Sequence, residues 1–285
     1  MTEDVRDHLD LGQYGIWRWW SGVTPELAVG LERLGFGTLW LGGSPSGDLA
    51  AAEQALDATS ILTVATGIVN VWQDPDPAQV AESFARVDAR HPGRFLLGVG
   101  IGHPEVAKEY TRPYDTLVRY VDGLLAGGVP RESLVLAALG PRVLRLAAER
   151  TAGAHPYLVP PEYTRQARDI LGAGPLLAPE QKVVLEADPQ KARAIGRPRV
   201  RFPYLAAVNY RSNLARLGWS EEDMNDGGSD ALIDALVAHG TDAQVAERVD
   251  AHLDAGADHV CVQLLTENDD QLLDDYTHLA RALGL

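Results

Sequence analysis

The stretch YGIWRWWSGVTPELAVGLERLGFGTLWL, residues 14–41, decides the fold. It holds a short apolar run at 14–17, a longer helical pattern at 24–36 and a second apolar run at 38–41. Short apolar runs bounded by turn residues are typical of buried strands, and a helix is the usual connection between parallel strands. The stretch therefore predicts one β/α unit.

The β/α unit recurs along the chain. Further apolar runs lie at 62–69, 95–99, 134–138, 153–156, 182–187 and 259–265. They are continuous rather than alternating, as expected for a parallel sheet covered by helices. Eight units in 285 residues predict an α/β fold, an eight-stranded parallel β/α (TIM) barrel. The alternative is an open doubly wound sheet, but its first βα turn should be rich in glycine, and here that turn reads WRWWSGVT.

The chain is expected to form a single domain over residues 1–285, with a helical insertion between strands 7 and 8. Residues 188–255 hold several helical patterns, which is too much chain for one crossover, and the insertion is placed at approximately 198–240. Insertions near the carboxyl ends of barrel strands often carry function. Two placements remain open, a lid or wall of the substrate pocket and packing against the barrel exterior.

A run of glycines ends the fourth predicted strand. FLLGVGIGH, residues 95–103, contains Gly98, Gly100 and Gly102 and stops at His103. The dinucleotide fingerprint G-x-G-x-x-G fails because His103 occupies the position of its third glycine. Glycines directly after a strand still let a flat ligand approach the backbone closely. The run therefore predicts a ligand-facing loop in a fold other than the Rossmann fold.

Composition excludes several classes of partner. A formal net charge of −15 argues against binding nucleic acid or an anionic membrane surface. The first residues, MTEDVRDHLDLG, lack the apolar core of a signal peptide, and no stretch approaches the roughly 18 apolar residues of a membrane span. These features predict a cytoplasmic protein that acts on a small molecule. The one cysteine, Cys261, is expected to be a buried thiol, and it excludes an internal disulfide.

The substrate pocket is predicted from the residues that follow the strands. In a β/α barrel, the carboxyl ends of the strands and the loops after them carry the active site. Aromatic walls with a few polar groups suit a flat ring. We predict that the substrate pocket is lined by Trp17, Trp20, Ser44, Trp72 and His155. Trp40 lies within a strand and is expected in the core.

Other types of chemistry find little support. The sequence has no histidine and carboxylate spacing that is typical of a metal site, so we predict no metal. Lys182 begins its predicted strand and is expected at the face opposite the active site, which argues against a Schiff base.

One helix could bind a phosphate. Leu139-Gly140-Pro141 opens a helical pattern, whose free N–H groups suit an anion, and Arg142 follows directly. The alternative for Arg142 is a solvated side chain on the helix surface.

The order of several segments resembles the luciferase-like monooxygenase superfamily and, within it, the branch that uses the deazaflavin coenzyme F420. The likeness extends from Gly12 to Leu265. The segments that carry it are GFGTLWLGG, VATGIVNVW with DPAQVAESF, HPGRFLLGVGIG, ALGPRVLRLAAER and TDAQVAERVDAHLDAGADHVCVQL. The resemblance implies a β/α barrel with a flavin or deazaflavin at the carboxyl ends of the strands.

The resemblance also implies a set of cofactor contacts. The backbone at Gly67 and Ile68 would form a bulge that supports the ring, often with a cis peptide bond between them. Gly100, Ile101, Gly102 and His103 would lie along the cofactor. The cofactor-binding residues implied in this way are Gly67, Ile68, Asn70, Gly100, Ile101, Gly102, Ala138, Leu139, Gly140 and Pro141, to which the helix argument adds Arg142.

The chain departs from related deazaflavin dehydrogenases at their acid and base residues. Those enzymes have an Asp-His pair after strand two and a Glu after the glycines of strand four, and the matching positions here hold Gly43-Ser44 and His103. His103 is therefore predicted as the catalytic proton donor, since the pKa of histidine lies near neutrality. A role in hydrogen bonding to the cofactor or in capping the next turn remains the alternative. His155 is a second candidate.

Three functions are consistent with these residues. The first is an oxidoreductase that transfers a hydride between F420 and a small organic substrate. The second is an FMN-dependent monooxygenase or reductase, and the third is a non-catalytic barrel that binds a deazaflavin or has lost cofactor binding. The resemblance further implies a homodimer, because the second and third helices resemble the dimer face usual in the family.

Overall fold

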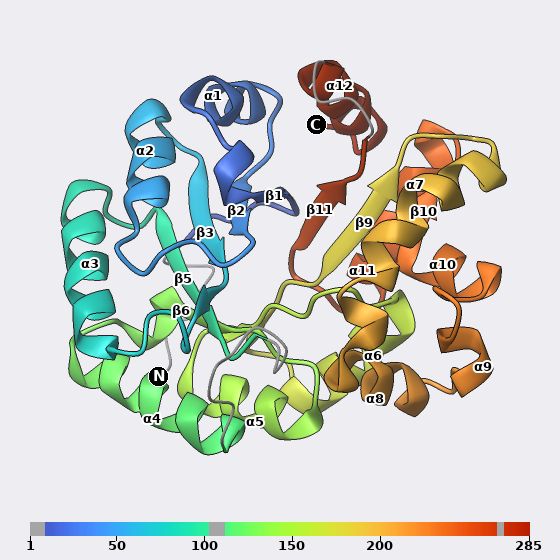
Figure 1. Ribbon diagram of the computed structural model, residues 1–285. Coiled ribbons are helices and arrows are strands. Elements are labelled where there is room, and N and C mark those ends of the chain that lie inside the picture. The colour runs from blue at the N-terminus through green and yellow to red at the C-terminus, as the bar shows by residue number, and fades with distance from the viewer. Residues whose placement is uncertain (1–8, 103–111, 267–270) are drawn as a thin grey trace.

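The computed structural model describes residues 9–102, 112–266 and 271–285, whose strands form one parallel sheet (Figure 1). The strands are β1 (Tyr14–Trp19), β2 (Thr38–Gly42), β3 (Thr63–Gly67), β4 (Val69–Asn70), β5 (Phe95–Gly100), β6 (Leu134–Leu136), β7 (Gly153–Ala154), β8 (Leu176–Leu177), β9 (Glu180–Val184), β10 (Val237–His239) and β11 (Val260–Leu264). Their order in the sheet is β10-β9-β11-β1-β2-β3-β5-β6-β7-β8, with β4 paired to β5. The prediction of an α/β fold with a parallel sheet is confirmed.

Residues 176–184 connect the two ends of this strand order. On one side the N–H of Ala178 donates to the carbonyl of Ala154, the last residue of β7, at 2.9 Å. On the other side the N–H of Cys261 in β11 donates to the carbonyl of Pro179, also at 2.9 Å. The sheet therefore returns on itself, which gives a fold of the TIM-barrel type.

The described residues hold eleven strand segments rather than the eight expected. One expected strand, 62–69, is divided, because Ile68 separates β3 from β4. A second difference is β8, which was not expected and is separated from β9 by Ala178 and Pro179. Proline has no N–H to donate to a neighbouring strand, which interrupts the ladder. The third difference is β10, a short segment that pairs with β9 and was not expected.

Helices cover the outside of the strands (Figure 1). They are α1 (Pro25–Arg33), α2 (Ala50–Ala58), α3 (Pro77–Arg90), α4 (Pro113–Ala126), α5 (Pro141–Arg150), α6 (Pro161–Leu171), α7 (Pro189–Arg201), α8 (Val208–Arg216), α9 (Glu221–Met224), α10 (Asp230–Leu236), α11 (Asp242–Asp254) and α12 (Leu272–Ala282). Proline at the first helical position is favourable because its missing N–H would have no partner within the helix. Across the described parts of the chain, no helix is long and apolar enough to cross a membrane.

The inside of the barrel has its own apolar cluster. Side chains from successive strands meet there, among them Trp17, Trp40, Ala65, Leu96, Val135 and Cys261. Trp40 and Cys261 are fully buried, which confirms both expectations. A larger cluster packs the helices against the outer face of the strands.

The chain between β9 and β10 is helical and has a separate apolar cluster. α7, α8, α9 and α10 lie together at one side of the molecule (Figure 1). Their cluster includes Val200, Leu205, Leu214, Met224 and Ile233. This region corresponds to the part of the chain where a helical insertion was expected at 198–240.

Two glycines of β5 serve strand packing. A Cβ on Gly98 would collide with the carbonyl oxygen of Thr66, whose hydroxyl accepts from the Gly98 N–H at 2.8 Å. A Cβ on Gly100 would lie 2.8 Å from the Cβ of Ala137 and 3.2 Å from the Ile68 side chain. The ligand-facing interpretation is thus wrong for Gly98, because the neighbouring strand already fills the space beside it, while Gly100 lies against Ala137 and Ile68.

Candidate active site

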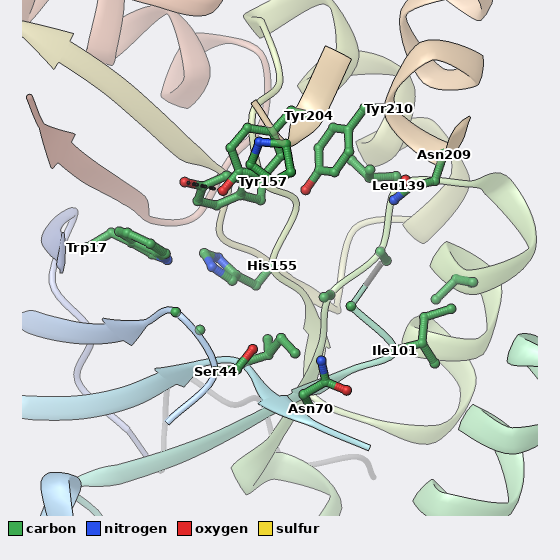
Figure 2. A pocket seen from close by; sticks show the side chains of 18 of the residues that line it. Trp17, Ser44, Asn70, Ile101, Leu139, His155, Tyr157, Tyr204, Asn209 and Tyr210 are labelled. Carbon is green, nitrogen blue, oxygen red and sulfur yellow. Dashed lines mark hydrogen bonds between the residues drawn. The ribbon is translucent and has the colours of Figure 1, made fainter. Parts of the chain in front are cut away.

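A cavity of about 420 Å³ opens at the carboxyl ends of the strands (Figure 2). Its wall combines strand ends, βα loops and the helical region after β9. The lining residues are Trp17, Trp19, Gly43, Ser44, Gly67, Ile68, Asn70, Gln73, Ile101, Gly102, Ala137, Ala138, Leu139, Gly140, Val143, His155, Tyr157, Pro203, Tyr204, Asn209 and Tyr210. The volume lies within the roughly 300–1,000 Å³ usual for small-molecule sites.

Five aromatic rings form a continuous wall on one side of the cavity. The ring centroid of Trp17 lies 5.9 Å from that of Trp19 and 5.2 Å from that of Tyr157. Tyr204 continues the wall, 5.2 Å from Tyr157 and 5.0 Å from Tyr210. Offset and edge-to-face pairs at these spacings are favourable. The wall presents apolar ring surface to any molecule in the cavity.

Backbone segments form another side of the cavity. Gly67 and Ile68 are joined by a cis peptide bond, as the family resemblance implied. A Cβ on Gly67 would lie 2.9 Å from Trp17 Nε1 and 3.3 Å from His155 Nε2. Gly102 has a positive φ of 55° and lies against the Asn70 side chain, where a Cβ would collide. Glycine is required at both places for the backbone to reach the cavity.

His155 lies at the floor of the cavity and is 2% exposed. Its Nδ1 donates to the carbonyl of Ala178 at 2.7 Å, since a carbonyl can only accept. Its ring stacks on Trp40, with centroids 4.2 Å apart. Burial, together with the nearby His259 ring, lowers the pKa of His155 to about 4. Its Nε2 is buried and has no hydrogen-bond partner among the described residues.

A buried polar network lies behind the aromatic wall. Lys182 Nζ donates to Tyr157 Oη at 2.8 Å, to Glu180 Oε1 at 3.1 Å and to Gln263 Oε1 at 2.8 Å. Tyr157 donates to the same Gln263 oxygen and accepts from the Tyr204 hydroxyl, a bond drawn dashed in Figure 2. Burial raises the pKa of Glu180 and lowers that of Lys182, and their mutual attraction opposes both shifts.

The expectation for Lys182 was wrong. β9 begins at Glu180, so Lys182 lies inside the strand, and its ammonium group touches a tyrosine that lines the cavity. The strand starts earlier than its apolar run, because Glu180 and Gln181 are polar yet buried. All three N–H donors of Lys182 are used, which holds the Tyr157 ring in place.

The predicted site residues fall into three sets. The structure brings together Trp17, Ser44, Gly67, Ile68, Asn70, Ile101, Gly102, Ala138, Leu139, Gly140 and His155 in the cavity lining. His103 lies outside the described residues. Gly100, Pro141, Arg142, Trp20 and Trp72 are described but do not line the cavity.

The five that do not line it have other surroundings. Trp20 lies in a short 3-10 helix and is 41% exposed, while Trp72 packs against the outer core. The Arg142 guanidinium lies 3.6 Å from the centroid of the Tyr114 ring, a cation–π contact. Pro141 is the first residue of α5.

Sequence reasoning missed most of the aromatic wall. Tyr157 follows His155 by two residues, so it could have been predicted from its place in the loop after a strand. Tyr204 and Tyr210, with Pro203 and Asn209, come from the helical region after β9 and support its placement as a pocket wall. Their sequence context, FPYLAAVNY, carries no signal that separates cavity-facing from core-facing rings.

The electrostatics of the cavity are nearly neutral. None of the described residues that line it is Asp, Glu, Lys or Arg. Its polar atoms come from amides, hydroxyls, the indole nitrogens and one neutral histidine. Within the described ranges, no three His, Cys, Asp or Glu side chains form a group that could hold a metal. The arrangement suits an uncharged, flat ligand.

Comparisons place the chain among known proteins. The family model described as luciferase-like monooxygenase matches residues 23–126 and 119–259. No curated protein gives a significant match.

Solved structures match over most of the chain. An F420-dependent secondary alcohol dehydrogenase in complex with an F420-acetone adduct has a TM-score of 0.72 at 18% identity, over 95% of this chain and 98% of that chain. The coenzyme F420-dependent tetrahydromethanopterin reductase of Methanopyrus kandleri has a TM-score of 0.72 at 16% identity, over 95% and 97%. The FMN-bound oxygenating constituent of 3,6-diketocamphane monooxygenase from Pseudomonas putida has 0.67 at 13%, over 96% and 97%. At these identities the likeness is one of fold.

Proposed function

Because the chain belongs to the luciferase-like monooxygenase family, we propose that it is an oxidoreductase that transfers a hydride between coenzyme F420 and a small organic substrate. The single observation that carries the proposal is the cavity itself, which has a volume of about 420 Å³. Its lining combines the aromatic wall with the backbone at Gly67-Ile68 and Gly102. A flat tricyclic ring fits between such surfaces, and glycine removes the side chains that would keep it from the backbone.

The residues present fit a deazaflavin. A Cβ on Gly67 or on Gly102 would meet neighbouring side chains, so both glycines leave bare backbone in the cavity wall, against which a flat ring can lie. The N-terminus of α5 follows Gly140, which lines the cavity, and no side chain of the described residues caps this helix. Free N–H groups at a helix N-terminus attract a phosphate. When bound, the deazaflavin supplies the ring carbon that accepts or gives the hydride.

Each group of residues has a stated role in this proposal. Trp17, Tyr157 and Tyr204 exclude water from one side of the cavity, which strengthens polar contacts inside it. The Lys182 network holds the Tyr157 ring in its orientation. We also propose His103 as proton donor on the sequence argument alone. Replacing His103 with Gln should then reduce turnover more than cofactor affinity, and equal turnover would remove this role.

The second candidate function uses FMN. The FMN-bound relative has a TM-score of 0.67 against 0.72 for the F420-dependent ones, and none of the described residues of the cavity lining distinguishes the two ring systems. FMN would support monooxygenation with a reductase partner, or a simple reduction. The third candidate is a non-catalytic barrel, because Gly43 and Ser44 stand where related dehydrogenases have their Asp-His pair.

Titration of the purified protein with F420 and with FMN separates these functions. Quenching of cofactor fluorescence reports binding of either ring. We expect F420 to bind with a submillimolar Kd and FMN to bind more weakly. Tighter binding of FMN would replace the first function with the second, and submillimolar binding of neither would remove both enzyme functions.

A further inference from the structure

Two unpartnered polar atoms lie side by side at the cavity floor. Trp17 is 3% exposed and His155 is 2% exposed, and neither Trp17 Nε1 nor His155 Nε2 has a hydrogen-bond partner among the described residues. Both atoms lie close to one point, 2.9 and 3.3 Å from where a Cβ on Gly67 would be. Figure 2 shows the Trp17 indole nitrogen directed toward the His155 ring. Buried polar atoms without partners are rare in proteins, so this pair points to a ligand.

The two atoms have opposite hydrogen-bonding character. The indole N–H of Trp17 can only donate. The Nδ1 of His155 keeps its proton because it donates to the carbonyl of Ala178 at 2.7 Å. The neutral ring therefore offers a lone pair at Nε2, which can only accept. The cavity lining thus offers one unpartnered donor and one unpartnered acceptor close to each other.

The surroundings hold His155 in this neutral form. Trp40 stacks on the ring, and Cys261 Sγ lies 3.6 Å from its Nδ1. His259 stands behind Trp40, accepts from the Trp40 indole N–H at 3.0 Å and donates to the carbonyl of Gly12. None of these neighbours is an anion that would favour an imidazolium, and Glu180 is bound to Lys182.

We propose that Trp17 Nε1 and His155 Nε2 form a subsite for a neutral hydroxyl group of the substrate. The hydroxyl oxygen accepts from the indole N–H, and the hydroxyl proton is donated to the imidazole nitrogen. The substrate is then an uncharged alcohol whose flat or cyclic body lies against the aromatic wall. The inference rests on the proposed function only in that it places the substrate in this cavity.

Other polar groups match the pair less well. A carbonyl or carboxylate oxygen would accept from Trp17 but would face the lone pair of His155. An ammonium group would suit His155 but would face the Trp17 N–H. A charged group would also lack a counter-ion, because the described lining contains no charged Asp, Glu, Lys or Arg side chain. A hydroxyl satisfies both atoms at once.

Four probes of one shape test the subsite in the full-length protein without cofactor. They are benzyl alcohol, benzaldehyde, benzoate and toluene. Binding is followed by the imidazole ¹⁵N resonances of histidine-labelled protein, which report the Nε2 of His155 directly. We expect benzyl alcohol to bind at least about tenfold more tightly than each of the other three, about 1.4 kcal/mol, and to shift the Nε2 resonance.

A matched pair of variants identifies the donor. Trp17→Phe removes the N–H but keeps a ring, and it should reduce the preference for benzyl alcohol over toluene about tenfold. Trp72→Phe, outside the cavity, should leave the preference unchanged. His155→Phe is a further variant for the acceptor, but the ¹⁵N measurement on the natural protein stands even if that variant fails to fold.

Several results would overturn the subsite. Equal binding of benzyl alcohol and toluene would mean that the pair holds water only, and tighter binding of benzaldehyde would make it a carbonyl subsite. An absence of binding by all four probes would also reject it. Displacement of benzyl alcohol by added F420 would assign the pair to the cofactor instead. Since the four probes are compared without cofactor, their order of affinity tests the subsite whether or not F420 binds, and it can fail separately from the F420 titration that tests the proposed function.

Discussion

The indole of Trp40 stacks on the imidazole of His155, with ring centroids 4.2 Å apart and planes 19° from parallel. Trp40 comes from β2 and His155 from the residue after β7, so the contact crosses the barrel interior. The Trp40 N–H is bound to His259, which fixes the plane of the indole. A core residue thereby sets the orientation of a residue at the cavity floor.

Trp40→Phe should destabilise the fold. The change removes the donor to His259 Nε2 and leaves that buried acceptor unsatisfied, at a cost of about 1–3 kcal/mol. Urea unfolding followed by circular dichroism measures the loss. Trp20→Phe is the control, because Trp20 is 41% exposed and its replacement should change the free energy of unfolding by less than about 0.5 kcal/mol. Equal stability of the two variants would contradict the structural role of Trp40.

Lys182→Met should reduce the free energy of unfolding by more than the small change in side-chain volume suggests. It leaves the Glu180 carboxyl buried without its cation, which typically costs about 3–5 kcal/mol. The double variant Lys182→Met with Glu180→Gln should recover part of that loss, because no buried charge remains. Arg150→Ala, which breaks the exposed pair with Asp122, should cost less than about 1 kcal/mol. Chemical unfolding of the four proteins gives the comparison, and a double variant no better than Lys182→Met would argue against a charged pair.

The protein should lose stability as the pH falls from about 6.5 to about 4. Burial lowers the pKa of His252 to about 3 and that of His259 to about 4, while the unfolded chain takes up protons near pH 6.5. Because the unfolded state binds more protons in this range, stability rises with pH, by up to about 1.4 kcal/mol per pH unit for each such group.

His252→Gln tests this pH dependence. Around pH 5 the variant should show a slope of unfolding free energy against pH that is smaller by about one proton, whatever its absolute stability. His278→Gln is the matched control, since His278 is an exposed histidine with 60% of its side chain accessible. An unchanged slope in His252→Gln would mean that His252 is protonated in the folded protein.

Gly140→Phe should block the cavity without harming the fold. A Cβ at Gly140 meets no atom within 4 Å, and the backbone there, with φ −84° and ψ 151°, suits any residue. The phenyl group would enter the space that the proposed cofactor needs, so F420 affinity should fall at least about tenfold, about 1.4 kcal/mol. Gly174→Phe is the control, because Gly174 is equally unhindered but exposed, and it does not line the cavity. Fluorescence titration compares the two, and Tm should agree within a few degrees.

The β/α repeat could be predicted because each barrel strand is buried on both faces and leaves a continuous apolar run in the sequence. The predicted strand boundaries were wrong where buried residues are polar, as at Glu180 and Gln181. Hydropathy alone does not show the hydrogen bonds that allow such residues to be buried. The prediction that Gly98 faces a ligand was also wrong. The sequence does not distinguish a glycine that is needed beside a neighbouring strand from one that is needed beside a ligand.

Part of the cavity could be predicted from the rule that strand ends carry the site, which placed Trp17 and His155 correctly in its lining. Tyr204 and Tyr210 could not, because they reach the cavity through the packing of a helical region whose path no local pattern defines. The cis peptide bond between Gly67 and Ile68 was implied by the family resemblance and not by the residues alone.

The helical wall has a consequence for how the specificity of this protein can change over evolutionary time. Tyr204 and Tyr210 stand on an apolar cluster that is separate from the one inside the barrel. Substitutions there can reshape one side of the cavity while the strands, the His155 floor and the backbone at Gly67 stay as they are. The molecule thus keeps the part that would bind the cofactor and the substrate hydroxyl apart from the wall that would contact the rest of the substrate, so the shape of that wall can change while the barrel stays the same.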